Sequence, residues 1–521
     1  MKTHPLARRR FLAEIGQATM VATLGPVWAA DLGLAPRSPD PGTAEALPGG
    51  DLELLVDYLI DTPLDQLQAG LVAKLAGGVS LRRLVAAGAL ANARVFGGGD
   101  YVGFHTFMAL APALHMASLM PRGREALPVL KVLYRNTHRL AETGGRPTTF
   151  PPVPPTLPPG ESATAEQLRA AVMAGDTARA EQLFAAQVVG DRSAAFDALL
   201  RVVEENVEVH RTVLPYRAWS MIDVVGPDHA AVLLRQSLRY CLDAEAQRRP
   251  EWEAHGRVLA RLLDEHGLPG RPPGTRDASD AWVGELGGTL FTASPEDAAA
   301  AVATALADGY RPEVIGEALA LAANQIVLRD PGRIPAWEMP GKTVGSVHGD
   351  SVGVHASDAV NAWRHLSQVG GGHHGAACLI LGAWQVARDR MARGPVLGSA
   401  EPVPSARQVG SIQDTAPDRL LAQLGEMIEG RLQSHAAAVV QRYADLGHPE
   451  RPLFDTLLRF AVSEDGALHA EKYFQTVWDD FHHTRPAYRW RHLLGLARVT
   501  ASEYGYPAPG QAEARTLVGV K

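Results

Sequence analysis

Apolar residues recur along most of this chain at spacings of three and four positions, which is the pattern of amphipathic α-helices. The segments "RRLVAAGALANARV" and "EVIGEALALAANQIV" follow this pattern closely. No run of alternating apolar and polar residues is convincing enough to predict a β-strand. The pattern therefore predicts an all-α fold.

The predicted helices recur in one order in two parts of the chain. Each part has a helix pair, a histidine-bearing helix, a proline-rich connector, an "FDxLLR" helix, a further histidine and a tryptophan. The histidine-bearing segments are "GDYVGFHTFMALAPALH" at 99–115 and "GDSVGVHASDAVNAWRH" at 349–365. This order predicts an internally duplicated protein with two helical halves, related by a pseudo-two-fold axis.

The duplication predicts the domain boundaries. Copy one is expected at 31–250, a connector at 251–284, copy two at 285–510 and a tail at 511–521. Within the copies, proline-rich segments at 146–162 and 394–408 predict stiff, extended linkers.

Residues 1–30 have the features of a secretory signal peptide. Arg8-Arg9-Arg10-Phe11-Leu12 fits the pattern of twin-arginine export signals, and cleavage is expected near Ala29 or Ala30. The apolar run is shorter than the roughly 20 residues that cross a bilayer, so we expect no membrane span in the mature protein. The predicted location is periplasmic or extracellular. Because this route carries folded chains, it favours proteins that take up a metal or cofactor before export.

Composition excludes several kinds of site. A formal net charge of −7 argues against a nucleic-acid partner. Only two cysteines are present, so neither a disulfide framework nor a thiolate metal site is expected, and any metal must use His, Asp or Glu. The sequence also lacks the motifs of covalent haem, zinc proteases and P-loop enzymes.

The histidine-bearing segments predict where a metal could bind. Asp100 and Asp350 are expected to cap helices, which would place His105 and His355 in the second helical turn. There the positive end of the helix dipole favours neutral imidazole, the form that binds metals. The second histidine of each segment lies ten residues further, about 15 Å along a straight helix, so it cannot share that metal. We expect these second histidines, His115 and His365, to form hydrogen bonds at helix ends.

The remaining ligands should come from the other duplicated histidines, His210 and His469. Polar residues precede each by four or five positions, Asn206 and Glu205 in copy one and Asp465 and Glu464 in copy two. A polar group at i−4 can orient a histidine ring, and a carboxylate can be an oxygen ligand. The predicted metal ligands are therefore His105, His210, His355, His469 and His348, and the predicted catalytic carboxylates are Asp350 and Glu464.

Structural interpretations compete with this hypothesis. A buried histidine is usually a hydrogen-bonded core residue, and "Gly-Asp-x-Val-Gly" can be a turn and cap that both copies need for folding. The retention of three histidine pairs in both copies favours the metal hypothesis. Copy two holds 11 of the 19 histidines, so chemistry confined to one half is expected there. The "GGGHHG" segment is equally typical of an exposed, flexible loop.

"PEVIGEALALAA" at 312–323, followed by "VHASDAVNAW" at 354–363, resembles segments of the questin-oxidase-like family. The resemblance covers a few dozen residues and implies a largely helical fold with oxygen-inserting chemistry on an aromatic ketone. It assigns no catalytic residue, and the export signal departs from a cytoplasmic oxidase that draws on a nicotinamide reductant.

These observations predict an exported metal-dependent oxidoreductase or oxygenase that acts on a small organic substrate. A divalent metal is the expected cofactor, with iron preferred because a site of histidines and a carboxylate leaves coordination positions open. One alternative is a non-catalytic helical scaffold or metal-binding protein of the cell envelope. Another is a hydrolase or lyase that uses histidine as general base with Asp350 or Asp358. A homodimer that exchanges the copies between chains stays open.

Overall fold

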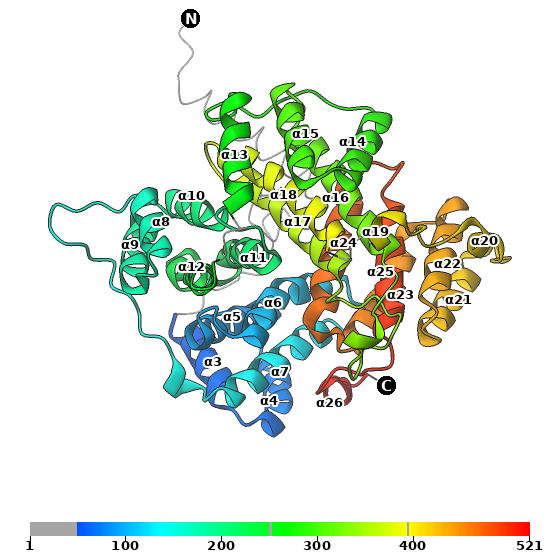
Figure 1. Ribbon diagram of the computed structural model, residues 1–521. Helices are drawn as coiled ribbons and strands as arrows, with labels where there is room; N and C mark the ends of the chain where they lie inside the picture. The colour runs from blue at the N-terminus through cyan, green and yellow to red at the C-terminus, as the bar shows by residue number, and fades with distance from the viewer. Residues whose placement is uncertain (1–48, 249–252, 393–394, 521) are drawn as a thin grey trace, which may run out of the picture. The chain divides into compact units, whose positions relative to one another are not determined.

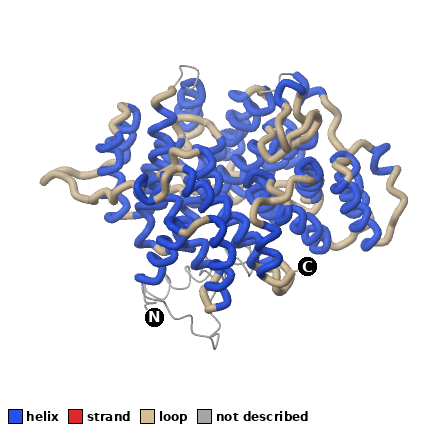
Figure 2. Tube along the Cα trace, turned by 90° about the horizontal axis from the view of Figure 1, so that it is seen from below, coloured by secondary structure: helices blue, strands red, loops and turns tan. Residues whose placement is uncertain are grey.

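The computed structural model describes residues 49–248, 253–392 and 395–520. Residues 54–521 form one compact unit, which is described below. The predicted signal peptide at 1–30 lies outside the described residues. Helices and loops make up the described part of the chain, in which no β-strand occurs (Figure 2). The all-α prediction is therefore confirmed.

The helices up to residue 245 belong to the predicted copy one. In chain order they are α3 (Gly49–Asp61), α4 (Leu64–Ala76), α5 (Leu81–Phe96), α6 (Tyr101–Leu119), α7 (Ala126–Glu142), η1 (Arg146–Thr148), α8 (Ala165–Met173), α9 (Thr177–Gly190), α10 (Arg192–Val203), α11 (Val209–Val225), η2 (Pro227–His229) and α12 (Ala230–Glu245).

The later helices form the connector, copy two and the tail. They are α13 (Glu253–Glu265), α14 (Asp280–Thr292), α15 (Pro295–Ala307), α16 (Pro312–Arg329), η4 (Pro335–Trp337), α17 (Val352–Val369), α18 (His374–Met391), α19 (Pro395–Ser399), α20 (Ala406–Gly410), α21 (Pro417–Glu429), α22 (Gln433–Asp445), α23 (Glu450–Ser463), η5 (Gly466–Leu468), α24 (His469–His483), α25 (Trp490–Glu503) and α26 (Gln511–Leu517).

Four helices from the two copies pack on one another in the middle of the unit (Figure 1). Helix α6 contacts α11 of its own copy and α24 of the other. Helix α17 correspondingly contacts α24 of its own copy and α11 of the other. This reciprocal packing places the N-terminal parts of two histidine-bearing helices from each copy against one another.

Equivalent residues of the two "FDxLLR" segments make equivalent contacts. The ring of Phe196 lies 4.3 Å from that of Trp219, and the ring of Phe454 lies 4.8 Å from that of Trp478, measured between ring centres. Both pairs join the "FDxLLR" helix to the next helix. These matching contacts are what a duplication predicts, and the duplication itself stays a prediction.

The two histidine-bearing helices begin with different caps. The Asp100 carboxylate accepts a hydrogen bond from the Gly103 amide at 2.7 Å, as expected for an N-cap. In copy two the cap is Ser351, whose hydroxyl oxygen accepts from the Val354 amide. The prediction that Asp350 caps this helix is therefore wrong, because the helix begins one position later and a serine fills the cap.

The two proline-rich connectors also differ from each other. The first contains η1 and then no helix before α8, in keeping with an extended linker. The second contains the short helices α19 and α20, so the prediction of an extended segment is wrong there. The tail forms α26, which packs against α4 and α7 of copy one.

Helix α6 is continuous through Pro112. It therefore keeps His105 and His115 apart, as expected for an unbroken helix. This is one described helix that is long and apolar enough to cross a membrane by length and composition. Of its most apolar window, 67% is buried inside the protein, so the same features also suit a core helix.

Candidate metal centre

Four of the predicted metal ligands lie together in one cluster, which we call the four-histidine cluster: His105, His210, His355 and His469. The Nε2 atoms of His105 and His210 are 3.3 Å apart, and those of His355 and His469 are 3.2 Å apart. The two pairs also face each other, with ring centres 5.1 Å apart for His105 and His469 and 5.6 Å for His210 and His355. Each copy supplies two rings, and the Nε2 contacts of 3.3 and 3.2 Å join rings of the same copy.

Each of the four histidines lies at the beginning of a helix. His210 is the second residue of α11 and His469 is the first of α24, while His105 and His355 are the fifth and fourth residues of α6 and α17. The first "FDxLLR" helix has already ended at Val203. His210 and His469 therefore do not share a helix with the residues four positions before them. The groups that contact their Nδ1 atoms lie two positions before, at Glu208 and Ala467.

Three of the four rings are held at Nδ1 by an oxygen that can only accept a hydrogen bond. His105 donates to the Tyr101 carbonyl at 2.7 Å, and His469 donates to the Ala467 carbonyl at 3.0 Å. His210 donates to the Glu208 carboxylate at 2.8 Å. A proton fixed on Nδ1 leaves a lone pair on Nε2, so these three rings present their metal-binding nitrogens to the cluster.

The two rings of the copy-one pair meet at their Nε2 atoms. With both rings neutral and Nδ1 of both His105 and His210 protonated, both Nε2 atoms are acceptors, and two acceptors 3.3 Å apart cannot bond to each other. A cation between them removes this conflict. Two nitrogens bound to one tetrahedral metal at about 2.0–2.1 Å lie about 3.3–3.4 Å apart, which matches the observed separation.

Burial keeps three of the four rings, those of His105, His355 and His469, in their neutral form. It lowers the pKa of His355 to about 3, with further contributions from the charges of His210 and Lys472. Burial and the charge of Lys472 also lower the pKa values of His105 and His469 far below the usual value for histidine. A proton is therefore a poor candidate for a cation that bridges His355 and His469.

Glu208 is the carboxylate that contacts the cluster, and the sequence analysis did not identify it. One oxygen accepts from His210, and the other accepts from the Arg211 amide at 2.9 Å and the Tyr240 hydroxyl at 2.8 Å. Burial raises the pKa of this carboxyl, but the hydrogen bonds from His210 and Arg211 prevail and lower it to about 2. Glu208 is also the N-cap of α11, and that signal, a capping carboxylate two residues before a repeated histidine, could have found it.

The backbone before His469 adopts an unusual conformation that aims its ring. Ala467 and Leu468 have φ values of 48° and 66°, which non-glycine residues rarely adopt. Such residues cost about 1–3 kcal/mol each and persist where the surrounding structure holds them. Gly349 packs directly on this histidine, since a Cβ at Gly349 would lie 2.2 Å from the His469 Cβ.

Aromatic side chains cover the copy-one pair. The rings of Tyr101 and Phe104 lie 4.3 and 4.9 Å from the ring of His105, and Phe104 also contacts Tyr240. Tyr101 is 56% exposed, and the side chain of His210 is 12% exposed. The cluster therefore approaches the solvent on its copy-one side, through an aromatic wall.

Copy two contributes a buried pair of charged residues beside the cluster. Lys472 follows His469 by three residues on α24, and Asp358 follows His355 by three on α17. Burial lowers the pKa of Lys472 to about 8, while the charge of Asp358 opposes this shift. The lysine and four helix N-termini bring positive potential to the cluster, so a metal ion there would need an anionic ligand beside it.

His115 and His365 lie outside the cluster, as expected for the second histidine of each segment. The Nε2 atom of His365 lies 3.6 Å from an Asp479 carboxylate oxygen, and its ring stacks on Tyr216 at 4.6 Å. The ring of His115 contacts Trp478 at 5.2 Å. Through these contacts α6 packs on α24, and α17 packs on α11 and α24, further along the helices than the four-histidine cluster.

His348 lies beside a carboxylate rather than beside another histidine. Its Nδ1 atom is 3.3 Å from Glu503, which also accepts a hydrogen bond from the Gly349 amide at 2.9 Å. Burial lowers the pKa of His348 to about 4 and raises that of Glu503 to about 8. His348 thus precedes the glycine, Gly349, that packs directly on His469.

The two predicted catalytic carboxylates are engaged by other groups. Asp350 pairs with Arg333 at 2.7 Å and Lys342 at 2.5 Å. Burial raises its pKa, but these cations prevail and lower it. Glu464 accepts hydrogen bonds from the amides of residues 505 and 506, both at 2.9 Å. Its carboxylate therefore anchors the segment after α25.

A scan against protein-family models gave no match, and searches of curated proteins and of solved structures gave no significant similarity. A functional assignment therefore depends on the geometry and chemistry of the cluster.

Proposed function

We propose that this protein is an exported metal-dependent oxidoreductase or oxygenase whose metal centre is the four-histidine cluster. The observation that carries the proposal is the pair of Nε2 atoms 3.3 Å apart in His105 and His210, each with its Nδ1 proton committed elsewhere. Such a pair has the separation of two ligands on one ion. Iron is the metal we expect, because a pair of histidine ligands leaves coordination positions open, as in iron-dependent oxygenases.

The protein groups have distinct tasks in this proposal. The Tyr101 carbonyl and Glu208 hold two rings in the metal-binding tautomer, and Glu208 adds a negative charge that offsets part of the metal's charge. Lys472 is the buried cation that would attract an anionic oxygen ligand. Iron bound there would supply the activation of dioxygen at its open positions.

The substrate would be a small organic molecule that reaches the cluster from its copy-one side. Tyr101, Phe104 and Tyr240 form an aromatic wall there, which suits an aromatic substrate. The resemblance to the questin-oxidase-like family points to the same class of substrate. Export through the twin-arginine route, also a proposal, would let the chain acquire its metal before it leaves the cytoplasm.

Oxygen consumption tests this function. The purified full chain, loaded with Fe(II), should consume dioxygen in the presence of a set of aromatic ketones and phenols. The His105→Ala variant should lose this activity, whereas the His138→Ala variant should keep it, because His138 lies on the half-exposed face of α7 beside Glu142. Equal activity in the His105→Ala variant would contradict the proposed centre.

The competing function is a non-catalytic helical scaffold in which the histidines only pack. It predicts a folded protein that stays metal-free after exposure to Fe(II), Zn(II) and Cu(II). It also predicts that His105→Ala lowers the unfolding temperature equally with and without added metal. A metal-dependent rise in unfolding temperature that His105→Ala abolishes would decide for the metal centre.

A further inference from the structure

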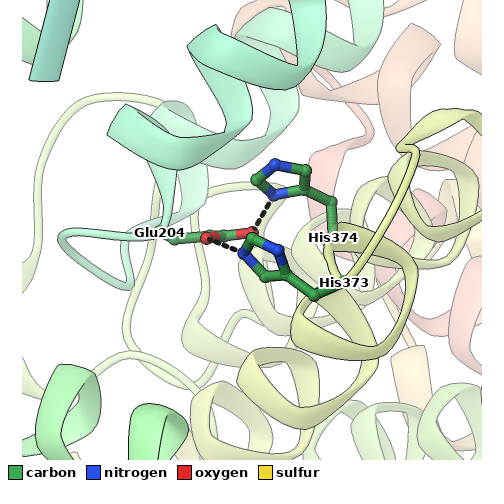
Figure 3. A group of neighbouring side chains, drawn as sticks. All are labelled: Glu204, His373 and His374. Atoms are coloured by element: carbon green, nitrogen blue, oxygen red, sulfur yellow. Dashed lines mark hydrogen bonds and ion pairs between the residues drawn. The ribbon is translucent and has the colours of Figure 1, made fainter. Parts of the chain in front are cut away.

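A second group of metal-binding side chains lies outside the four-histidine cluster. It consists of Glu204, His373 and His374, whose side chains point toward one another (Figure 3). One candidate ligand atom from each residue lies within 4.8 Å of the other two. The Nδ1 atom of His374 is 2.6 Å from one Glu204 oxygen, and the Nε2 atom of His373 is 3.8 Å from the other.

These separations suit one ion. Nitrogen and oxygen ligands lie about 2.0–2.2 Å from zinc, so two of them on the same ion lie about 3.3–3.5 Å apart in tetrahedral geometry. The observed values of 2.6 and 3.8 Å bracket this range. The 2.6 Å contact is a hydrogen bond between Nδ1 of His374 and Glu204, so a metal ion would displace the proton of this bond, and His373 would move closer to the carboxylate.

Contacts of the neighbouring backbone hold Glu204 on one side of the group and His373 and His374 on the other. Glu204 directly follows α10, and its backbone carbonyl lies 3.1 Å from the Nε2 atom of His255. The "GGGHHG" segment packs on α10, because the Gly371 amide donates a hydrogen bond to Asp197 at 2.8 Å. A Cβ at Gly370 would lie 2.9 Å from the His374 Cβ. The segment is thus a fixed turn rather than the flexible loop that its composition also allowed.

The Glu204 carboxylate is buried and incompletely paired. Its Oε2 atom accepts no hydrogen bond from the described residues, and the closest approach of an Arg201 guanidinium nitrogen is 3.7 Å. The whole residue is only 2% exposed. A buried carboxylate oxygen without a hydrogen bond is costly, and a cation that binds it would remove that cost.

A cleft of about 600 Å³ gives access to this carboxylate. Glu204 and His373 line it together with Leu259, Leu263 and several charged residues. The arginines at its wall have other partners: Arg169 and Arg248 pair with Glu205, and Arg257 pairs with Glu253. They therefore do not neutralise Glu204, whose charge is left to the two histidines and to Arg201.

We infer that Glu204, His373 and His374 form a second divalent metal site, of the zinc type, that opens on this cleft. Two histidines and one carboxylate are the ligand set of many zinc sites that keep a position for water or another small ligand. Here that position would face the cleft, because both Glu204 and His373 line it. The inference does not depend on a metal in the four-histidine cluster.

Zinc and cobalt binding tests the inference on the full chain. Chelator-treated wild-type protein is dialysed against Zn(II), and Co(II) binding is followed by its visible absorption. His373→Ala should remove one equivalent of zinc or weaken its binding at least tenfold, and Glu204→Gln should do the same. His138→Ala, a histidine beside a glutamate on α7, is the matched control and should bind like the wild type.

The His105→Ala/His355→Ala variant separates this site from the proposed centre. It should keep one equivalent of zinc that disappears when His373→Ala is added. The His373 side chain is 33% exposed, so this substitution should leave the thermal unfolding temperature nearly unchanged and keep the test interpretable. Unchanged zinc binding in a folded His373→Ala variant would overturn the inference, whatever happens at the four-histidine cluster.

Discussion

Substitution of Glu208 by glutamine should switch the tautomer of His210. One Glu208 oxygen accepts from the Arg211 amide and the Tyr240 hydroxyl, while the other accepts from Nδ1 of His210. A glutamine side chain has only one oxygen. We expect this oxygen to face the Arg211 amide and the Tyr240 hydroxyl, which both donate hydrogen bonds. Its amide nitrogen then faces His210 and donates, so Nδ1 must become an acceptor and the proton moves to Nε2.

The consequence is a direct hydrogen bond where we propose a metal. Nε2–H of His210 would donate to Nε2 of His105 across 3.3 Å, and the lone pair needed for a metal would be lost. Loss of a group that orients a metal-bound histidine typically costs 10- to 100-fold in affinity, which corresponds to about 1.4–2.7 kcal/mol. We expect a loss at the upper end, because the tautomer changes in addition to the orientation.

The assay is a competition titration of Fe(II) or Zn(II) against a chelator of known affinity, in the His373→Ala background so that the other proposed site does not contribute. Glu181→Gln is the control, since Glu181 is a buried glutamate of copy one that pairs with Arg235 and Arg239. Metal affinity within twofold of the parent in the Glu208→Gln variant would refute the tautomer argument. Equal weakening by Glu181→Gln would show a general loss of structure instead.

Three further predictions test the surroundings of the cluster. Gly349→Ala should lower the free energy of unfolding by about 1–3 kcal/mol and weaken metal binding, because the new Cβ would lie 2.2 Å from the Cβ of His469. Thermal unfolding with and without metal measures both effects. Lys131→Met should lower the free energy of unfolding by about 3–5 kcal/mol, because it leaves the fully buried carboxylate of Glu471 without its ion pair. Urea unfolding measures this loss, and a loss under 1 kcal/mol would contradict the prediction. Neutral, half-buried His355 should make the protein acid-sensitive. The unfolded chain gains a proton at this residue below about pH 6.5 and the folded chain only near pH 3, so the free energy of unfolding falls over that window by about 1.4 kcal/mol per pH unit. His355→Gln should reduce that slope by one proton in urea titrations at several pH values, and an unchanged slope would exclude His355 as a source.

The repeated segments allowed the four histidines to be selected before the fold was known. A ten-residue spacing on one helix excludes His115 as a partner of His105, and this geometric argument needs only the helix rise. The structure places the first histidines with His210 and His469, from the other repeated segment. The repeated segments thus identified the members of the cluster without any knowledge of how the helices pack.

The carboxylates could not be found in the same way. The choice of Glu464 assumed that one helix runs through to His469, whereas the structure has a break with left-handed residues before α24. Spacing arguments fail across such a break, because residues on either side no longer share a helix face. Glu204 is beyond any local argument, since 170 positions separate it from His374 and only tertiary packing brings them together.

The most direct test of the four-histidine centre is the metal content of the protein as the cell delivers it. The full chain is expressed with its N-terminal segment, recovered without added metal, and analysed for iron, zinc and copper per chain, in the wild type and in the His105→Ala/His355→Ala variant. The proposal predicts about one equivalent of metal that the variant loses while it stays folded by circular dichroism. Equal metal content in the two proteins, or a folded wild type without metal, would contradict it.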